Sequence, residues 1–290
     1  MKFKLVEQFD NSTGYNFKED ISMMTELFQV SKEELFNLAE IDNIDSKENL
    51  DKLYNYCYDH KAYINEIKWL EYKDLFDTKN TKLLCHGSRN GITGAIRLDA
   101  SGESNDFANG FYLGETLKQA GMFVSDDENS SIYLMSFNTT GLKPVKFIVD
   151  NTWMLAIGTF RDTLNDYTNN PIIQKIIDKV NNADYIIAPI ADNRMFELID
   201  AFIAGELTDK QTLYALSATH LGMQYVLKSQ KALDNLSNLD RCYICPIERA
   251  SFNVANDVES TTSLNKAILA KYRYKMKGKY IDEILDKNIV

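Results

Sequence analysis

The 290-residue chain lacks the features that mark several large protein classes. It has no run of apolar residues long enough to span a bilayer, and its N-terminal MKFKLVEQFD is too short and too charged for a signal peptide. It also has no Walker loop, no G-x-G-x-x-G fingerprint and no H-E-x-x-H zinc motif. The sequence therefore predicts a cytoplasmic protein without a membrane contact, outside the P-loop, Rossmann and zincin classes.

Cysteine and histidine are scarce, with 4 and 3 residues respectively. Scattered thiols at Cys57, Cys85, Cys242 and Cys245 do not make a disulfide framework, so a reducing compartment is expected. Cys242 and Cys245 form a lone C-x-x-C, and zinc would need two further ligands that the spacing does not supply. His220 likewise has no partner at metal-ligand spacing. We therefore expect no metal site.

Charge is unevenly distributed within the net charge of −10. Residues 1–80 hold 10 Lys against 17 Asp or Glu, which argues against a nucleic-acid surface there. Six basic residues cluster near the other end: Lys266, Lys271, Arg273, Lys275, Lys277 and Lys279. This basic tail, residues 251–290, fits either a solvated helix face or a contact with phosphates.

The acidic N-terminal part has helical patterning. Ser31 with Glu34 and Asp45 with Glu48 have helix-start spacing, and the second helix would carry an apolar stripe that includes Leu53. Residues 24–38 resemble a degenerate helix-turn-helix whose second helix is acidic, so protein contacts are expected in place of DNA binding. We predict a small helical N-terminal domain over residues 1–80.

Two apolar segments, LLCHGS at 83–88 and GFYLGETLKQAGMFV at 110–124, read as strands that end in exposed polar or aromatic groups. Thr116 and Gln119 have capping-box spacing, and four following residues fall on one helical face: Leu117, Ala120, Gly121 and Val124. The second strand therefore turns directly into a helix.

The remaining segments alternate strand and helix patterns. Residues 89–110 predict a long exposed loop, in which Arg97 and Asp106 are candidate cofactor contacts. Strands are expected at 131–137, 145–150 and 185–192, the last as a buried central strand. Residues 152–217 are mostly helical, with Pro171 at a helix start. Arg161 in this region fits either a pyrophosphate contact or an exposed helix position.

The motifs in order resemble the ADP-ribosyltransferase superfamily, in the branch that carries a His, then a Tyr, then a second aromatic. His86 with Gly87, Tyr112 with Phe123, and Gln224 match the three motifs over residues 83–245. Phe123 stands where Tyr is more frequent, and Gln224 stands where the most active members have Glu. An uncharacterised bacterial and phage group is most similar, through HGS, GFYL, PIADNRMFELID and LG-x-QYV.

The resemblance implies a mono-ADP-ribosyltransferase, a glycosyltransferase that uses NAD as substrate to modify a macromolecule, with a toxin or phage-conflict role. Tyr112 and Phe123 would clamp the nicotinamide, while His86, Gly87, Ser88 and Asp106 would complete the cofactor-binding set. His86, Tyr112 and Gln224 are the implied catalytic residues.

Three alternatives remain open at this point: a degenerate module that binds NAD without transfer, an NAD glycohydrolase, and a regulator that acts through its N-terminal helices. Since Gln224 carries no charge, it would stabilise an oxocarbenium ion less than Glu does, and Gln224→Glu is expected to speed nicotinamide release.

The resemblance also implies the fold class. It predicts an α+β domain over residues 81–250, with ADP-ribosyltransferase-like split antiparallel sheets that flank the NAD site and a helical insertion over residues 152–217.

Overall fold

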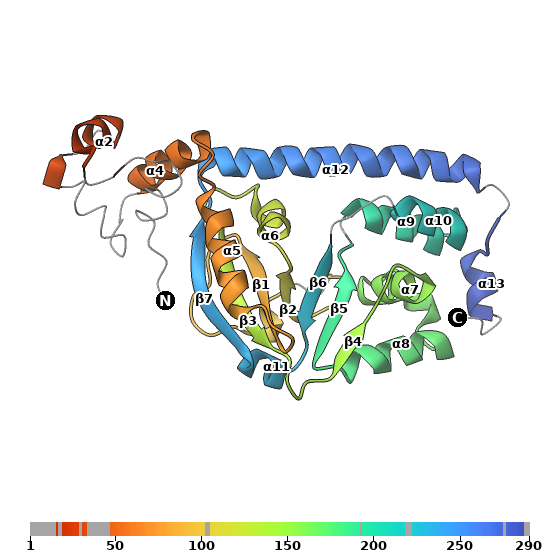
Figure 1. Cartoon of the computed structure of the whole chain (residues 1–290). Coiled ribbons are helices and arrows are strands. Elements are labelled where there is room, and N and C mark those ends of the chain that lie inside the picture. The colour runs from red at the N-terminus through yellow and green to blue at the C-terminus, as the bar shows by residue number, and fades with distance from the viewer. Residues whose placement is uncertain are drawn as a thin grey trace.

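The computed structural model describes residues 16, 19–28, 31–33, 47–101, 105–191, 193–217, 222–274 and 277–286, and these form an α+β protein (Figure 1). Seven strands make one sheet: β1 (Thr81–Ser88), β2 (Phe111–Gly114), β3 (Ser131–Asn138), β4 (Pro144–Lys146), β5 (Tyr185–Pro189), β6 (Met223–Leu227) and β7 (Leu236–Tyr243). The described helices are α2 (Ile21–Phe28), α4 (Lys47–Asp59), α5 (Ile64–Phe76), α6 (Leu117–Val124), α7 (Asn151–Phe160), α8 (Pro171–Asn181), α9 (Asn193–Ile203), α10 (Asp209–Leu216), α11 (Gln230–Asp234), α12 (Pro246–Arg273) and α13 (Ile281–Asp286).

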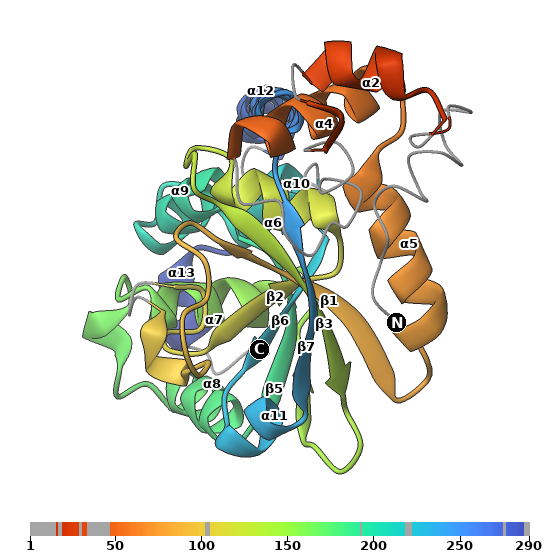
Figure 2. The same ribbon diagram turned by 90° about the vertical axis from the view of Figure 1, so that its left-hand side faces the viewer.

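The sheet has the order β4-β5-β6-β2-β1-β3-β7 and is strongly twisted (Figure 2). Only β4 and β5 run parallel, and every other neighbouring pair is antiparallel. The α+β class is thus confirmed, whereas two separate antiparallel sheets were expected and one mixed sheet is found. Its two halves meet weakly, because β1 and β2 share a single register pair, Cys85 and Gly114.

The turn from β2 into α6 follows the sequence pattern. Thr116 accepts from the backbone of Gln119, whose side chain in turn accepts from the backbone of Thr116, so the predicted capping box is confirmed. The four residues of the predicted helical face are buried. They pack with Leu83 and Cys85 of β1, so α6 covers the β1 half of the sheet.

Helices α7, α8 and α9 cover the same face at the other half of the sheet. Their core surrounds Trp153 and Phe202, both fully buried, together with Ile186 of β5 and Val226 of β6. Pro171 opens α8 as predicted. Strand β5 forms where the apolar run predicted it, but it is second from the sheet edge and not central.

Strand β4 is shorter than the predicted 145–150 segment. After Lys146 the chain leaves the sheet, and Ile148 and Val149 are exposed. Asp150 then caps α7, since its carboxylate accepts from the Trp153 backbone N–H at 2.8 Å. A capping bond therefore takes precedence over the β-propensity of Ile148 and Val149.

Helices α4 and α5 pack directly on the sheet. From α5, Asn65 donates to the Tyr243 carbonyl at 2.6 Å, and Lys68 forms an ion pair with Asp240 at 2.8 Å. The described part of the predicted N-terminal domain is thus joined to β7. Glu34, the partner of Ser31 in its capping box, lies outside the described residues, and so do Asp45 and most of the proposed second helix of the helix-turn-helix.

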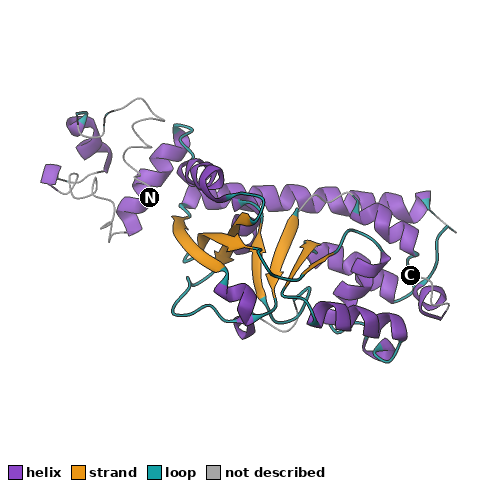
Figure 3. Cartoon of the chain, turned by 60° about the horizontal axis from the view of Figure 1, so that its bottom comes forward, coloured by secondary structure: helices purple, strands orange, loops and turns teal. Residues whose placement is uncertain are grey.

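The C-terminal residues form more helix than the sequence pattern indicated. Helix α12 begins at Pro246 and runs along one side of the molecule, past α6 and α10 (Figure 3). Within the described ranges, no helix combines the length and the apolar character that a bilayer crossing requires.

Candidate functional site

The three sequence motifs lie on adjacent strands, because β6, β2 and β1 are neighbours in the sheet. In the register, Gly114 of β2 lies opposite Gln224 of β6 and also opposite Cys85 of β1. His86 therefore follows directly after the only register pair that joins the two halves. The structure brings together segments that are more than a hundred residues apart in sequence.

His86 contacts the backbone of the Tyr112 segment. Its Nδ1 lies 2.8 Å from the Tyr112 carbonyl oxygen, and its ring stacks on Phe111 with centroids 4.3 Å apart. Burial lowers the pKa of His86, and the bond to Tyr112 opposes this effect. Since a carbonyl only accepts, Nδ1 carries the proton of the neutral ring, and Nε2 is left as an acceptor.

The Tyr112 ring lies on the opposite side of β2 from Phe111 and His86, because alternate strand residues face opposite sides. The Tyr112 hydroxyl donates to the Ala108 carbonyl at 2.7 Å and accepts from the Phe107 N–H at 3.1 Å. Tyr112 therefore ties the end of the 89–110 loop to the sheet.

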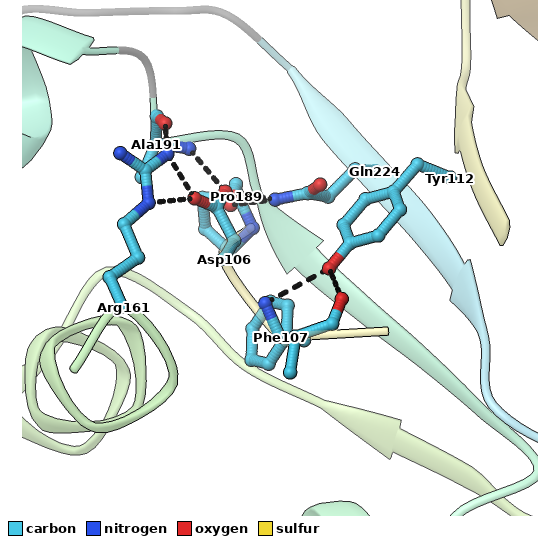
Figure 4. A network of polar contacts seen from close by, with 8 residues as sticks. Asp106, Phe107, Tyr112, Arg161, Pro189, Ala191 and Gln224 are labelled. Carbon is cyan, nitrogen blue, oxygen red and sulfur yellow. Dashed lines mark hydrogen bonds and ion pairs between the residues drawn. The ribbon is translucent and has the colours of Figure 1, made fainter. Parts of the chain in front are cut away.

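Asp106 lies at the centre of a buried polar network (Figure 4). Its Oδ1 accepts from Nε and Nη2 of Arg161 at 3.0 and 2.5 Å. Its Oδ2 accepts from the Ala191 backbone N–H at 3.1 Å and from Gln224 Nε2 at 2.6 Å. Asp106 is only 5% exposed, so the prediction that residues 89–110 form an exposed loop is wrong at this residue. The hydrogen bonds to both of its oxygens compensate Asp106 for the loss of water, and they hold this end of the loop against the sheet.

Gln224 has a fixed amide orientation. Its Nε2 donates to Asp106 and, at 3.2 Å, to the Pro189 carbonyl. Since both partners only accept, the nitrogen must face them and Oε1 must point elsewhere. Among the described residues, no hydrogen bond to Oε1 is present. Gln224 is 6% exposed, and its Oε1 is a neutral hydrogen-bond acceptor.

Arg161 neutralises Asp106 at the end of α7. Besides the two bonds to the carboxylate, its Nη2 donates to the Ala191 carbonyl at 2.8 Å, and its guanidinium lies 4.4 Å from the Phe196 ring centroid. Burial raises the pKa of Asp106, while Arg161 and the two amide donors oppose that shift. These donors all favour the ionised carboxylate, so the network is an ion pair without net charge.

Lys228, at the end of β6, also secures the loop. Its ammonium donates to the Phe107 carbonyl at 2.7 Å and to the Asn109 carbonyl. Burial lowers the pKa of Lys228 to about 8. The sequence analysis missed this lysine, because a single basic residue after a strand gives no signal of the loop that it will meet.

The other predicted contacts lie around the start of α6. Phe123 is 68% exposed, with the Arg89 guanidinium 5.7 Å from its ring centroid. Its ring makes no direct contact with Tyr112 in the described part of the chain, so a clamp would need a ligand between them. Ser88 is half-buried at the end of β1, and Gly87 lies against α6, where an added Cβ would be 2.5 Å from the Ala120 oxygen. Arg97, the other loop candidate, is exposed and pairs with Asp99.

The cysteines do not form a reactive centre. All four are free and buried, and burial raises the pKa of Cys57, Cys242 and Cys245 to about 12. Within the described ranges, no three His, Cys, Asp or Glu residues are placed to hold a metal ion.

Fold and site together define an α+β protein in which one mixed sheet brings a His, a Tyr and a Gln motif onto three adjacent strands. The chain belongs to a family described as protein of unknown function (DUF3990), whose model matches residues 83–238. No curated protein and no solved structure matches the chain.

Proposed function

We propose that this protein is a mono-ADP-ribosyltransferase that takes ADP-ribose from NAD and attaches it to a macromolecular acceptor. The observation that supports this best is the convergence of the His86, Tyr112 and Gln224 motifs on the adjacent strands β1, β2 and β6, with the His86 side chain on one side of the sheet and those of Tyr112 and Gln224 on the other. The convergence is what the ADP-ribosyltransferase resemblance requires of these motifs. The fold would then be a joined form of the split sheets of that superfamily.

In this reaction His86 and Gln224 would each accept a hydrogen bond from the bound NAD. His86 Nε2 would accept a hydrogen bond from a ribose hydroxyl, since Nδ1 is held by the Tyr112 carbonyl. Gln224 lies on the other side of the sheet, which it shares with Tyr112, and there its Oε1 would accept from a hydroxyl of the bound nucleotide. Phe123, already under the Arg89 guanidinium, would offer an open aromatic face to the nicotinamide ring.

A second candidate is an NAD-binding protein without turnover. It is favoured by the pairing of Asp106 with Arg161, because the carboxylate bonded to Gln224 already has its own counter-charge. A developing oxocarbenium ion at Gln224 would then be stabilised by a neutral amide, at a cost on the order of 10² to 10³ in rate relative to a site with one more electrostatic group.

One experiment separates the candidates. The purified protein is incubated with NAD labelled separately in its nicotinamide and adenylate parts, with and without cell extract as a source of acceptor. Transfer labels a macromolecule as nicotinamide is released, a glycohydrolase releases nicotinamide and free ADP-ribose, and a binding module gives saturable binding alone. Absence of binding at millimolar NAD would contradict both candidates.

A further inference from the structure

The outer face of α12 carries an apolar stripe. Four of its side chains are more than half exposed, and they are Val254, Val258, Leu269 and Tyr272 at 63, 60, 56 and 78%. Asn265, also exposed, lies between them. Val254, Val258, Asn265 and Tyr272 have the spacing of a and d positions in successive heptads, so at about 100° per residue they lie on one side of the helix.

The opposite face of α12 is the one that packs on the molecule. Phe252 lies against α6, where an added Cβ on Gly121 would be 2.4 Å from its ring. Further contacts join α12 to α4, α9 and α10. In Figure 1 the helix crosses the upper part of the molecule, with α4 near its N-terminal end and α6, α9 and α10 below it. The Phe252 side chain, which makes the contact with α6, is thus on the face of α12 opposite the stripe.

The stripe is self-complementary when two copies run antiparallel. If the centre lies between residues 263 and 264, Val258 of one helix lies opposite Leu269 of the other, and Val254 lies within one residue of the position opposite Tyr272. Asn265 then lies near the centre, where a single polar residue at a heptad position fixes register. A parallel arrangement would instead place the basic ends of both helices together.

The charge sequence of α12 fits the same orientation. Glu248 and Arg249 are bonded within the chain, and so is Arg273, which donates to Tyr214. Of the other charged residues, Asp257 and Glu259 are in the first half, and Lys266 and Lys271 are in the second. Antiparallel pairing sets the acidic half of one helix along the basic half of the other. In this register position 257 lies within one residue of the position opposite 271, which brings an Asp near a Lys at the flanking positions that select partner and orientation.

We propose that α12 is a homodimerisation helix that pairs with α12 of a second copy in antiparallel orientation. The stripe extends over residues 254–272, about 27 Å of helix at about 1.5 Å per residue. Such a contact is small beside a standard protein interface, so the dimer forms at roughly micromolar concentrations and dissociates on dilution.

Sedimentation velocity across a dilution series tests the proposal. The full-length protein shifts from monomer to dimer as concentration rises, and Val258→Asp raises the dissociation constant on the order of 100-fold, because each dimer loses two buried valines and gains two buried charges. Ile148→Asp is the matched control, since Ile148 is 61% exposed but lies far from α12 in sequence and on the β4–α7 connection. A protein that stays monomeric, or dimers unaffected by Val258→Asp, would overturn the proposal.

Charge reversal tests the orientation. Asp257→Lys and Lys271→Asp should each weaken the dimer, whereas the double variant should restore the wild-type dissociation constant within about threefold. A dissociation constant for the double variant that is higher than that of either single variant would contradict antiparallel pairing.

Crosslinking tests the register. Val254→Cys with Tyr272→Cys should form an intermolecular disulfide, while Val254→Cys alone should not, because the two copies of residue 254 would be about 27 Å apart. The native cysteines are buried, and the wild-type protein gives the background level of crosslinking. Crosslinking of the single variant would indicate a parallel pair. Binding of the stripe to anionic vesicles by a protein that remains monomeric would assign the face to lipid and overturn the dimer.

Discussion

Asp106 is the residue that most changes the interpretation of the site. It accepts hydrogen bonds from four donor groups on Arg161, Ala191 and Gln224. These partners come from the end of α7, the segment after β5, and β6. One buried carboxylate therefore fixes three segments of the site, and Gln224 is held by it.

The sequence predicted faster nicotinamide release for Gln224→Glu, but the Asp106 network makes this substitution destabilising in the otherwise unchanged protein. A Glu at this position has no N–H for Asp106 or Pro189, and it sets a second carboxylate within hydrogen-bond distance of the first. We expect Gln224→Glu to lower the free energy of unfolding by roughly 3 kcal/mol, since a buried like-charge pair also loses its hydrogen bonds. Urea denaturation measures this loss.

Two further variants sharpen that test. Gln224→Met removes the same donors without adding charge, so it should be less damaging than Glu. The double variant Asp106→Asn with Gln224→Glu exchanges the amide and the carboxylate between the two positions. The amide introduced at position 106 can then donate to the carboxylate introduced at position 224. This double variant should recover part of the stability lost in Gln224→Glu, and it is the background in which faster nicotinamide release is expected. A wild-type unfolding curve for Gln224→Glu would show that Asp106 and Gln224 are not coupled.

Arg161 should be required for folding stability. Arg161→Met leaves the buried Asp106 carboxylate without its counter-charge, and we expect a loss of about 3 to 5 kcal/mol in the free energy of unfolding. Arg97→Met is the control, because Arg97 forms an exposed ion pair with Asp99 and its removal should leave the unfolding curve unchanged. Equal effects of the two variants would mean that Asp106 is stabilised without Arg161.

His86→Ala should abolish nicotinamide release if the protein turns over NAD. The variant loses one hydrogen bond and one ring contact, so we expect only about 1 to 2 kcal/mol of lost stability. Circular dichroism melting and nicotinamide release are measured on the same preparation. His60→Ala is the control, because His60 is exposed and makes the same two kinds of contact, both with Tyr56, so it should leave nicotinamide release unchanged. Retained turnover in folded His86→Ala would remove His86 from the reaction.

At the scale of elements, the contact between β1 and α6 depends on Gly87. A Cβ there would lie 2.5 Å from the Ala120 carbonyl oxygen and 3.0 Å from Val124 Cγ1, so Gly87→Ala must push α6 away from the strand. We expect a loss of about 1 to 3 kcal/mol in the free energy of unfolding. Ser88→Ala, one residue further along β1, serves as the control. An unfolding midpoint for Gly87→Ala equal to that of the control would show that α6 can move without cost.

Elements followed their sequence signals wherever the signal was local. The capping box at Thr116 and the proline at the start of α8 both appear as predicted. Strand lengths were less predictable, because pairing partners and caps decide where a strand ends. Strand β4 stops at Lys146, since Asp150 begins α7 and only β5 is available as a neighbour.

At the scale of the whole molecule, Glu248 connects pH to stability. It lies in the first turn of α12, accepts from Asn65 of α5 at 2.7 Å, and burial raises its pKa to about 7 from 4.5. Between these values the folded protein holds a proton that the unfolded chain releases. The free energy of unfolding should therefore fall as pH rises from 4.5 to 7, by about 3 kcal/mol in total.

The comparison with Glu248→Gln isolates this effect. The Gln variant keeps the shape and an acceptor for Asn65 but does not titrate at this position. The stability difference between Gln variant and wild type should grow in favour of Gln between pH 4.5 and 7, and then stay constant. Parallel stability curves across this range would mean that Glu248 is not buried as an acid.

The amino-acid sequence by itself determined the parts that depend on neighbours along the chain. Helix starts, the strand-to-helix turn at 111–124, the apolar strand at 185–189 and the order of the three motifs follow from residue type and spacing. These signals are local because a cap or a period of alternation involves residues only a few positions apart.

Only the tertiary structure decided how those parts meet. No spacing rule connects Asp106 with Arg161 or Gln224, which lie 55 and 118 positions away. Strand pairing joined both halves into one sheet, and strand alternation set the His86 and Tyr112 rings on opposite sides of β2. Burial of Asp106 then required a counter-charge and amide donors from distant segments, because an ionised carboxylate away from water is stable only when both of its oxygens are paired.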